Sequence, residues 1–162
     1  MADAMGSKQG SVFLEVDGLK GETAGDRPGQ IQLFSFNWGV SMPMTNGNGT
    51  MRAAGRPVMR DVTVTKPYDI TSPSLMLKCA KGEEIKSIKL HMLKLDAMGK
   101  GGKLMEYSTY TMDQVLVTSV TVDASVDPPE EVVSFNFQRI TQDYNSPQGK
   151  PSATWSLKDM GK

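Results

Sequence analysis

Few residues in this chain have the chemistry that catalysis needs. His91 is the only histidine and Cys79 the only cysteine, so a histidine-dependent triad, a thiol nucleophile or a zinc site must use one of them. The sequence indicates no third group near either residue that could orient a base beside a nucleophile. His91 alternates with Leu90 and Met92 as in a strand, and we expect it to be an ordinary strand residue. We expect Cys79 to be a small core residue on an apolar helix face.

Other patterns give only weak signals for an enzyme. The acidic pairs Glu83-Glu84 and Glu130-Glu131 could serve a glycosidase, which needs two carboxylates at a fixed separation. Adjacent carboxylates at turns are more typical of solvated surface, and that is our interpretation. The glycines of TNGNGT (45–50) lack the Lys-Ser and helix that follow a phosphate-binding loop. We therefore predict no enzyme, no catalytic or metal-binding residues and no cofactor.

Methionine is the residue type that stands out, with twelve in the chain. Met42, Met44 and Met51 lie in the stretch 40–56, which contains Pro43, three glycines and no steady hydrophobic period. Such long loops are usually functional or disordered, and the pattern makes an ordinary hairpin turn improbable. Flexible apolar side chains on a projecting segment suit a protein contact surface. The alternative is that the loop folds back and caps its own core.

Length and composition limit the possible classes. At 162 residues the chain fits one domain that can bury a core. Lys plus Arg equals Asp plus Glu, so no excess charge draws the chain to nucleic acid or to an anionic membrane. The N-terminus has no basic start followed by an apolar run, and no window approaches the roughly 18 apolar residues that a membrane span needs. We expect a cytoplasmic protein whose export, if any, uses no signal peptide.

The elements that must position these residues are mostly strands. Alternating apolar residues predict a half-buried strand at 11–18 and a strand at 31–39 whose Phe34, Phe36 and Trp38 share one face. Further strands are predicted at 58–65, 85–95, 103–112, 113–123, 132–140 and 153–158. The segments from 85 to 123 resemble a meander. Seven to nine strands with one helix favour an antiparallel barrel or sandwich.

One short helix interrupts this pattern, from Pro73 to Lys81. Ser72 suits the N-cap, Pro73 suits the first helical position, and Gly82 offers a left-handed exit. The apolar residues that recur at helical spacing are Leu75, Met76, Cys79 and Ala80. A helix of about two and a half turns is too short to be stable alone, so it must lie on an apolar surface made by the strands.

Six segments taken together resemble one known family, the hemolysin-coregulated proteins (Hcp) that form the inner tube of the bacterial type VI secretion system. They are VFLEVDGLKGE, LFSFNWGV, VTVTKPYDITSPSLMLKCAKGE, LMEYSTYTMDQVLVTSV, PPEEVVSFNFQRITQDY and WSLK, in the family's order and almost from end to end. The resemblance implies a single domain over residues 1–162. Its expected fold is mainly β, a small antiparallel β-barrel of two sheets with one short flanking α-helix and an extended loop at about 40–56.

The resemblance also implies a structural role in a secreted tube. Hexameric rings would stack inside a contractile sheath, and firing of the sheath would expel the tube, which is cytoplasmic before firing and then reaches the medium or a target cell. The implied partners are further copies, the sheath, spike or baseplate proteins, and effectors in the lumen. The loop would reach a neighbouring subunit or the next ring. Its predicted contact residues are Met42, Met44, Met51, Arg52 and Arg56.

Two other classes stay open at this point. A monomeric ligand-binding or chaperone-like β-barrel would have an internal apolar cavity and would not need the long loop. A hydrolase would use His91 or Cys79.

Two stretches depart in detail from family members, the Met-rich loop and GETAGDRPGQ (21–30). These departures affect the expected ring contacts and leave the expected fold unchanged.

Overall fold

The structure is a computed structural model that describes residues 12–46, 49, 52–95 and 103–158. Within these ranges the chain forms many strands and one α-helix, as predicted. The elements are β1 (Val12–Val16), β2 (Ile31–Gln32), β3 (Ser35–Asn37), β4 (Val40–Ser41), β5 (Met44–Asn46), β6 (Arg52–Ala54), β7 (Val58–Met59), β8 (Val62–Pro67), α1 (Ser72–Lys81), β9 (Ile85–Leu95), β10 (Leu104–Asp123), β11 (Glu130–Tyr144) and β12 (Ser152–Ser156).

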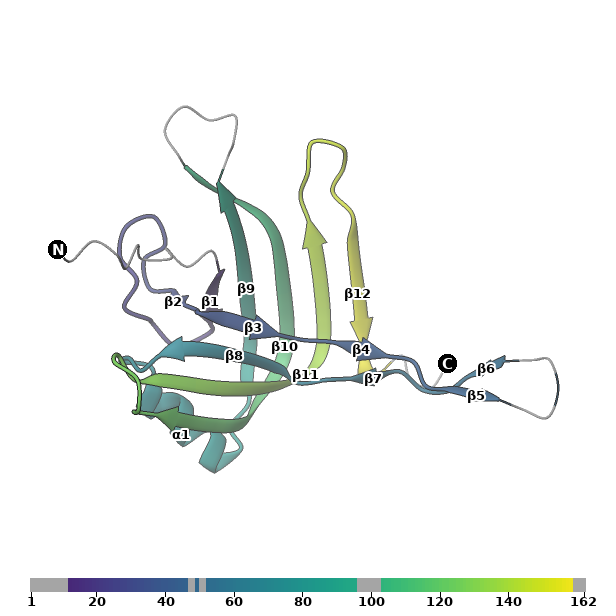
Figure 1. The fold of residues 1–162 in the computed structure, drawn as a ribbon, viewed down its shortest axis with the longest axis horizontal. Coiled ribbons are helices and arrows are strands. Elements are labelled where there is room, and N and C mark those ends of the chain that lie inside the picture. The colour runs from purple at the N-terminus through teal and green to yellow at the C-terminus, as the bar shows by residue number, and fades with distance from the viewer. Residues whose placement is uncertain (1–11, 47–48, 50–51, 96–102, 159–162) are drawn as a thin grey trace.

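Eight of these strands form one curled antiparallel sheet (Figure 1). Its order is β2-β1-β9-β10-β11-β8-β3, and β12 pairs with the second half of β11. The meander predicted for 85–123 is confirmed only in part, because β9 and β10 pair as expected but the third strand of the meander is β11. The strands predicted at 103–112 and 113–123 are a single strand, β10. Gln114 takes a left-handed φ of 51° there, and pairing with β9 and β11 continues on both sides of it.

One segment joins the two ends of the curled sheet. β2 pairs with β1 at one end, β3 pairs with β8 at the other, and only Leu33 and Phe34 separate β2 from β3. The Leu33 N–H donates to the Val12 carbonyl at 3.0 Å, and the Phe34 N–H donates to the Thr65 carbonyl at 2.8 Å. Neighbouring residues thus hydrogen-bond to opposite edges, and the strands enclose one core as a small barrel.

The core consists of inward-facing aliphatic and aromatic side chains from all the long strands, together with Leu75 of the helix. The prediction that Phe34, Phe36 and Trp38 share a buried face is wrong for Phe34, which is 53% exposed. Phe36 and Trp38 do pack against the core, each with its ring centroid within 6 Å of that of Tyr110. The crossing between the sheet edges breaks the strand alternation, which leaves Leu33 buried in place of Phe34.

The helix begins one residue earlier than predicted. Thr71, not Ser72, occupies the N-cap, and its side chain makes no capping hydrogen bond. Pro73 is consequently the second helical residue, where a missing N–H is still harmless. The predicted left-handed exit is confirmed, because Gly82 has φ 62° and its N–H donates to the Cys79 carbonyl.

Only a narrow stripe of the helix meets the barrel. Leu75 is fully buried, and Cys79 is partly buried and packs against the core, as expected. Met76 and Ala80 are exposed, so the predicted apolar face was too wide. Leu77 is exposed as well. The helix of the described residues lacks the length and the apolar character that crossing a membrane would require.

Candidate assembly surface

The described residues between 40 and 59 (40–46, 49 and 52–59) form a narrow arm that projects from the barrel along the longest axis of the molecule (Figure 1). β4 pairs with β7, and further out β5 pairs with β6, both antiparallel. The Gly55 N–H donates to the Pro43 carbonyl at 2.8 Å, and a Cβ on Gly55 would lie only 3.0 Å from that oxygen, so the close approach favours glycine. The segment expected to be a loop is therefore a paired ribbon, whereas most of the turn for which an ordinary hairpin form was judged improbable (47–51) lies outside the described residues. The strands of this hairpin are two or three residues long, and most of their side chains are exposed, so no alternation marks them.

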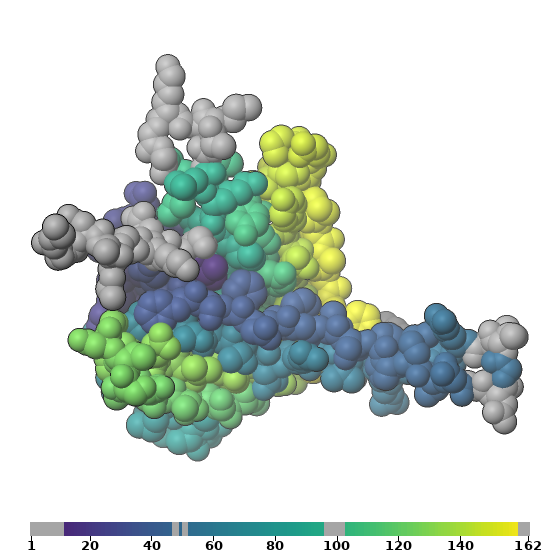
Figure 2. Space-filling model, viewed as in Figure 1, coloured from purple at the N-terminus to yellow at the C-terminus, as the bar shows by residue number. Residues whose placement is uncertain are grey.

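The residues predicted as contact residues lie on this arm. Met42 is 46% exposed and Met44 is 52% exposed. Arg52 and Arg56 are also exposed, whereas Met51 lies outside the described residues. The alternative in which this segment folds back over the core does not hold for the described part of the arm, which projects away from the barrel as Figure 2 shows.

A second group of polar residues surrounds His91. The imidazole is mostly buried, with Nδ1 3.0 Å from Glu106 Oε2 and Nε2 3.0 Å from Glu15 Oε2. Arg27 Nη2 donates to the same Glu106 oxygen at 2.6 Å, and Thr109 Oγ1 donates to Glu106 Oε1 at 2.7 Å. The strand position of His91 was predicted. Its partners were not, because they become neighbours only through the pairing of β9 with β1 and β10.

This group has the arrangement of an ion-pair cluster and not of a nucleophile with its base. Both ring nitrogens of His91 face carboxylates, so neither is left to take a proton from an attacking group. Burial alone would raise the pKa of Glu106, but hydrogen bonds from Arg27, Thr109 and His91 outweigh it and lower this pKa to about 2. Among the described residues, no set of three His, Cys, Asp or Glu side chains is placed to hold a metal ion.

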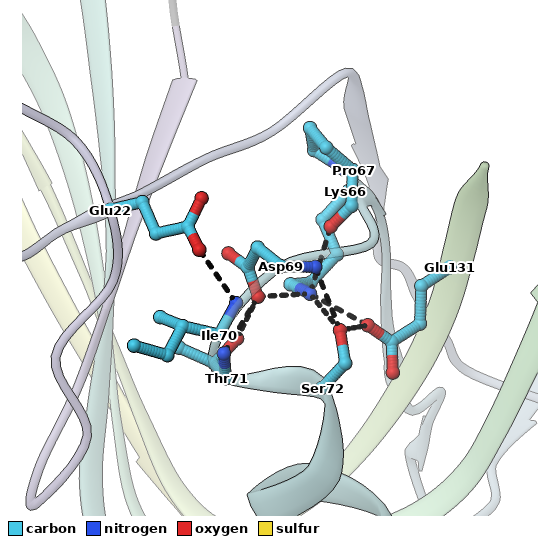
Figure 3. A network of polar contacts seen from close by, with 8 residues as sticks. All are labelled: Glu22, Lys66, Pro67, Asp69, Ile70, Thr71, Ser72 and Glu131. Atoms are coloured by element: carbon cyan, nitrogen blue, oxygen red, sulfur yellow. Dashed lines mark hydrogen bonds and ion pairs between the residues drawn. The ribbon is translucent and has the colours of Figure 1, made fainter. Parts of the chain in front are cut away.

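A third group ties the start of the helix to the barrel (Figure 3). Lys66 and Glu131 are both fully buried, and Lys66 Nζ lies 2.6 Å from Glu131 Oε2. Nζ also donates to Asp69 Oδ1 at 2.9 Å, to the Pro67 carbonyl at 3.0 Å and to Ser72 Oγ at 3.2 Å. The buried charge is thus surrounded by oxygen acceptors, as a buried ammonium requires.

The Ser72 hydroxyl is fully used in this network. It donates to Glu131 Oε2 at 2.5 Å and accepts from the Asp69 N–H at 3.0 Å. Ser72 is the first residue of the helix and not its N-cap, so the predicted capping role is replaced by this network. The interpretation of the acidic pairs as solvated surface holds for Glu83 and Glu84 and is wrong for Glu131.

The alternative of a ligand-binding barrel predicts an internal apolar cavity. In the described residues the core is filled by packed side chains, and a cleft of about 640 Å³ lies instead against loop 23–27. The lining of the cleft combines this loop with Phe13 and Leu93. This arrangement differs from the enclosed cavity that the alternative requires.

Comparisons with known proteins agree with the fold and identify a family. The family described as "Type VI secretion system effector, Hcp" matches residues 13–144. Protein hcp1 of Pseudomonas aeruginosa is 29% identical over 153 residues, which are 93% of this chain and 89% of that protein. A crystal structure of a type VI secretion system effector from Yersinia pestis is similar with a TM-score of 0.72 at 26% identity, covering 90% of this chain and 99% of that one.

Hcp1 from Salmonella typhimurium has the same fold, with a TM-score of 0.71 at 24% identity over 92% of this chain and 95% of that one. The family match runs from β1 to the end of β11 and so includes the arm, the helix and every long strand. The protein therefore belongs to the Hcp family of the type VI secretion system.

Proposed function

We propose that this protein is a structural subunit of the inner tube of the type VI secretion system. Six copies form a ring, rings stack into a tube, and a contractile sheath expels the tube. Membership of the Hcp family supports this role. The single observation that carries the proposal is the arm, which projects exposed methionines and arginines away from a barrel that is already closed around its own core.

The arm exposes apolar side chains to water, which is energetically unfavourable, and it therefore suits a contact between copies. Val40, Met42, Met44 and Val58 are each about half exposed, close together along one narrow ribbon. Each such side chain gains on the order of 1 kcal/mol when another protein covers it. A two-stranded ribbon that stands alone is also only marginally stable, so a neighbouring copy would fix its shape.

The wider role follows from the same assembly. Before firing, the subunit is cytoplasmic and contacts other copies together with the sheath and the spike or baseplate. After firing, it reaches the medium or a target cell, and effectors travel in the lumen of the rings. These partners are proteins, and neither nucleic acid nor a membrane has a part in the proposal.

Substitution of the arm methionines tests the proposal. In the variant Met42→Asp/Met44→Asp, two charges would be buried unpaired at the contact, so assembly should be lost while the subunit stays folded. Light scattering after size exclusion should report six chains per particle for the wild type and a smaller particle for the variant. Negative-stain images should show rings only for the wild type.

The matched control is Met76→Asp, which places a carboxylate on an equally exposed methionine of the helix. It should retain the ring. A wild type that stays monomeric at high concentration would contradict the proposal and favour the monomeric barrel. Unfolding of the arm variant would mean that these methionines support the subunit itself.

A further inference from the structure

The arginines of the chain divide into two groups. Arg27 and Arg139 make ion pairs with Glu106 and Asp113 at 2.6 Å. The other three are Arg52, Arg56 and Arg60, which lie in the arm or at its base. No ion pair within the described residues involves them. Residues 40–59 contain no acidic residue, so the arm carries uncompensated positive charge.

The acidic residues show the reverse arrangement. From residue 104 to 138 the chain contains six acidic residues and no Lys or Arg. Three of the six are neutralised from elsewhere, since Arg27 bonds Glu106, Arg139 bonds Asp113 and Lys66 bonds Glu131. The remaining three are Asp123, Asp127 and Glu130, which have no ion pair within the described residues.

These three carboxylates gather at the turn between β10 and β11, among exposed apolar side chains. Val122 is 48% exposed, Val126 is 44% exposed and Tyr68 is 53% exposed. The Tyr68 N–H donates to the Pro129 carbonyl at 3.0 Å, which places Tyr68 beside the turn. We call this set the tip; it comprises Tyr68, Val122, Asp123, Val126, Asp127 and Glu130.

The tip and the arm lie at opposite ends of the molecule. In Figure 2 the arm extends to the right and the bright green turn lies at the lower left. The two surfaces cannot meet within one copy. Each combines exposed apolar side chains with unpaired charge, and the charges are of opposite sign.

We propose that the tip of one copy receives the arm of a neighbouring copy, with Arg52 and Arg56 paired to Asp123 and Asp127. The arm methionines pack on the valines of the tip. This inference rests on the proposed tube function and names the surface that the arm contacts. A contact between two different surfaces is heterologous, so it repeats from copy to copy and builds a ring or a stack.

The ionisation of the tip agrees with this pairing. Hydrogen bonds from the Ser125 hydroxyl and backbone N–H outweigh burial and lower the pKa of Asp123. Its carboxylate is therefore charged at neutral pH and available to a guanidinium, whose planar donors match a carboxylate in two parallel hydrogen bonds.

Reversal of the charges tests the contact. The arm variant is Arg52→Glu/Arg56→Glu, and the tip variant is Asp123→Lys/Asp127→Lys. Each should reduce the assembled fraction at least tenfold in sedimentation velocity at low salt, because like charges then face each other. An equimolar mixture of the two variants should assemble again, since each can then pair with the other. A chain that carries all four substitutions should assemble as well.

The matched control is Asp17→Lys/Asp26→Lys, which reverses two exposed acids outside the tip and should leave assembly unchanged. Circular dichroism should show that every variant is folded. Assembly of the tip variant at the wild-type level would overturn this inference and leave the tube proposal intact. Failure of both the mixture and the four-substitution chain would equally overturn it. A wild type that never assembles would overturn both proposals.

Discussion

Replacement of Lys66 by Met should be among the most damaging single changes to the fold. Lys66 and Glu131 are both fully buried and lie 2.6 Å apart. Lys66→Met leaves the Glu131 carboxylate in the interior with only the Ser72 hydroxyl as a donor, and it removes the cation beside Asp69. Loss of one partner of a buried pair costs about 3–5 kcal/mol. Domains of this kind have a total stability of about 5–15 kcal/mol, so a large share would be lost.

The double variant Lys66→Met/Glu131→Leu shows how much of this loss comes from leaving one charge buried without its partner. It removes both charges and fills the site with apolar groups, so it should be more stable than Lys66→Met alone. Glu131 Oε1 has no hydrogen-bond partner within the described residues, so replacement by leucine loses no hydrogen bond at that atom. Ser72 keeps the hydrogen bond from the Asp69 N–H in either variant.

Urea unfolding followed by tryptophan fluorescence measures these differences, because Trp38 and Trp155 pack against the core. The background Met42→Asp/Met44→Asp should keep the protein from assembling, because assembly would add to the apparent stability. Lys86→Met is the control, since Lys86 is exposed on β9. A loss below about 1 kcal/mol for Lys66→Met would refute the reasoning, as would a double variant no more stable than the single one.

Three further changes test the packing, the backbone and the ion pairs. Leu75→Ala empties a fully buried site and should cost about 2–5 kcal/mol in urea unfolding, whereas Leu77→Ala, at an exposed position of the same helix, should cost under about 0.5. Gln114→Gly should raise the unfolding free energy by up to about 1 kcal/mol, because φ is 51° there, and Gln114→Ala should bring no such gain. The pKa of Glu106 is about 2 in the folded protein and 4.5 as its ordinary value, so the ionised carboxylate stabilises the fold above pH 4.5. This contribution disappears as the pH falls from 4.5 to about 2. Thermal unfolding of Glu106→Gln should therefore decline less over that range than the wild type.

The fold could be predicted where local pattern and tertiary packing agree. The alternation of Ile88 and Leu90 marks β9, and Gly82 marks the end of the helix, because each depends on neighbours in the chain. Phe34 could not be placed, since its exposure results from the crossing between two sheet edges. Met76 could not either, because the width of the helix stripe depends on how the helix lies on the barrel.

The polar groups were missed for a related reason. Lys66 follows Val62 and Val64 at a spacing of two residues, so its inward direction could be predicted from the strand period. Its partner could not, because Glu131 becomes its direct neighbour only through the register of β8 with β11. The His91 cluster depends in the same way on the pairing of three strands. The exposed methionines of the arm needed no register, and their segment could be singled out from composition alone.

Charged residues at the contact surfaces and charged residues buried in the barrel should respond differently to added salt. Charges near a contact surface mainly set the rate of association and are screened beyond about 8 Å at physiological ionic strength. Apolar contacts between arm and tip are not screened, so added salt should slow assembly much more than it speeds dissociation. The Lys66–Glu131 pair is out of reach of salt, and the urea midpoint should hardly change. Stopped-flow light scattering measures both rates, and an association rate that does not depend on salt would contradict the arginine–aspartate pairing.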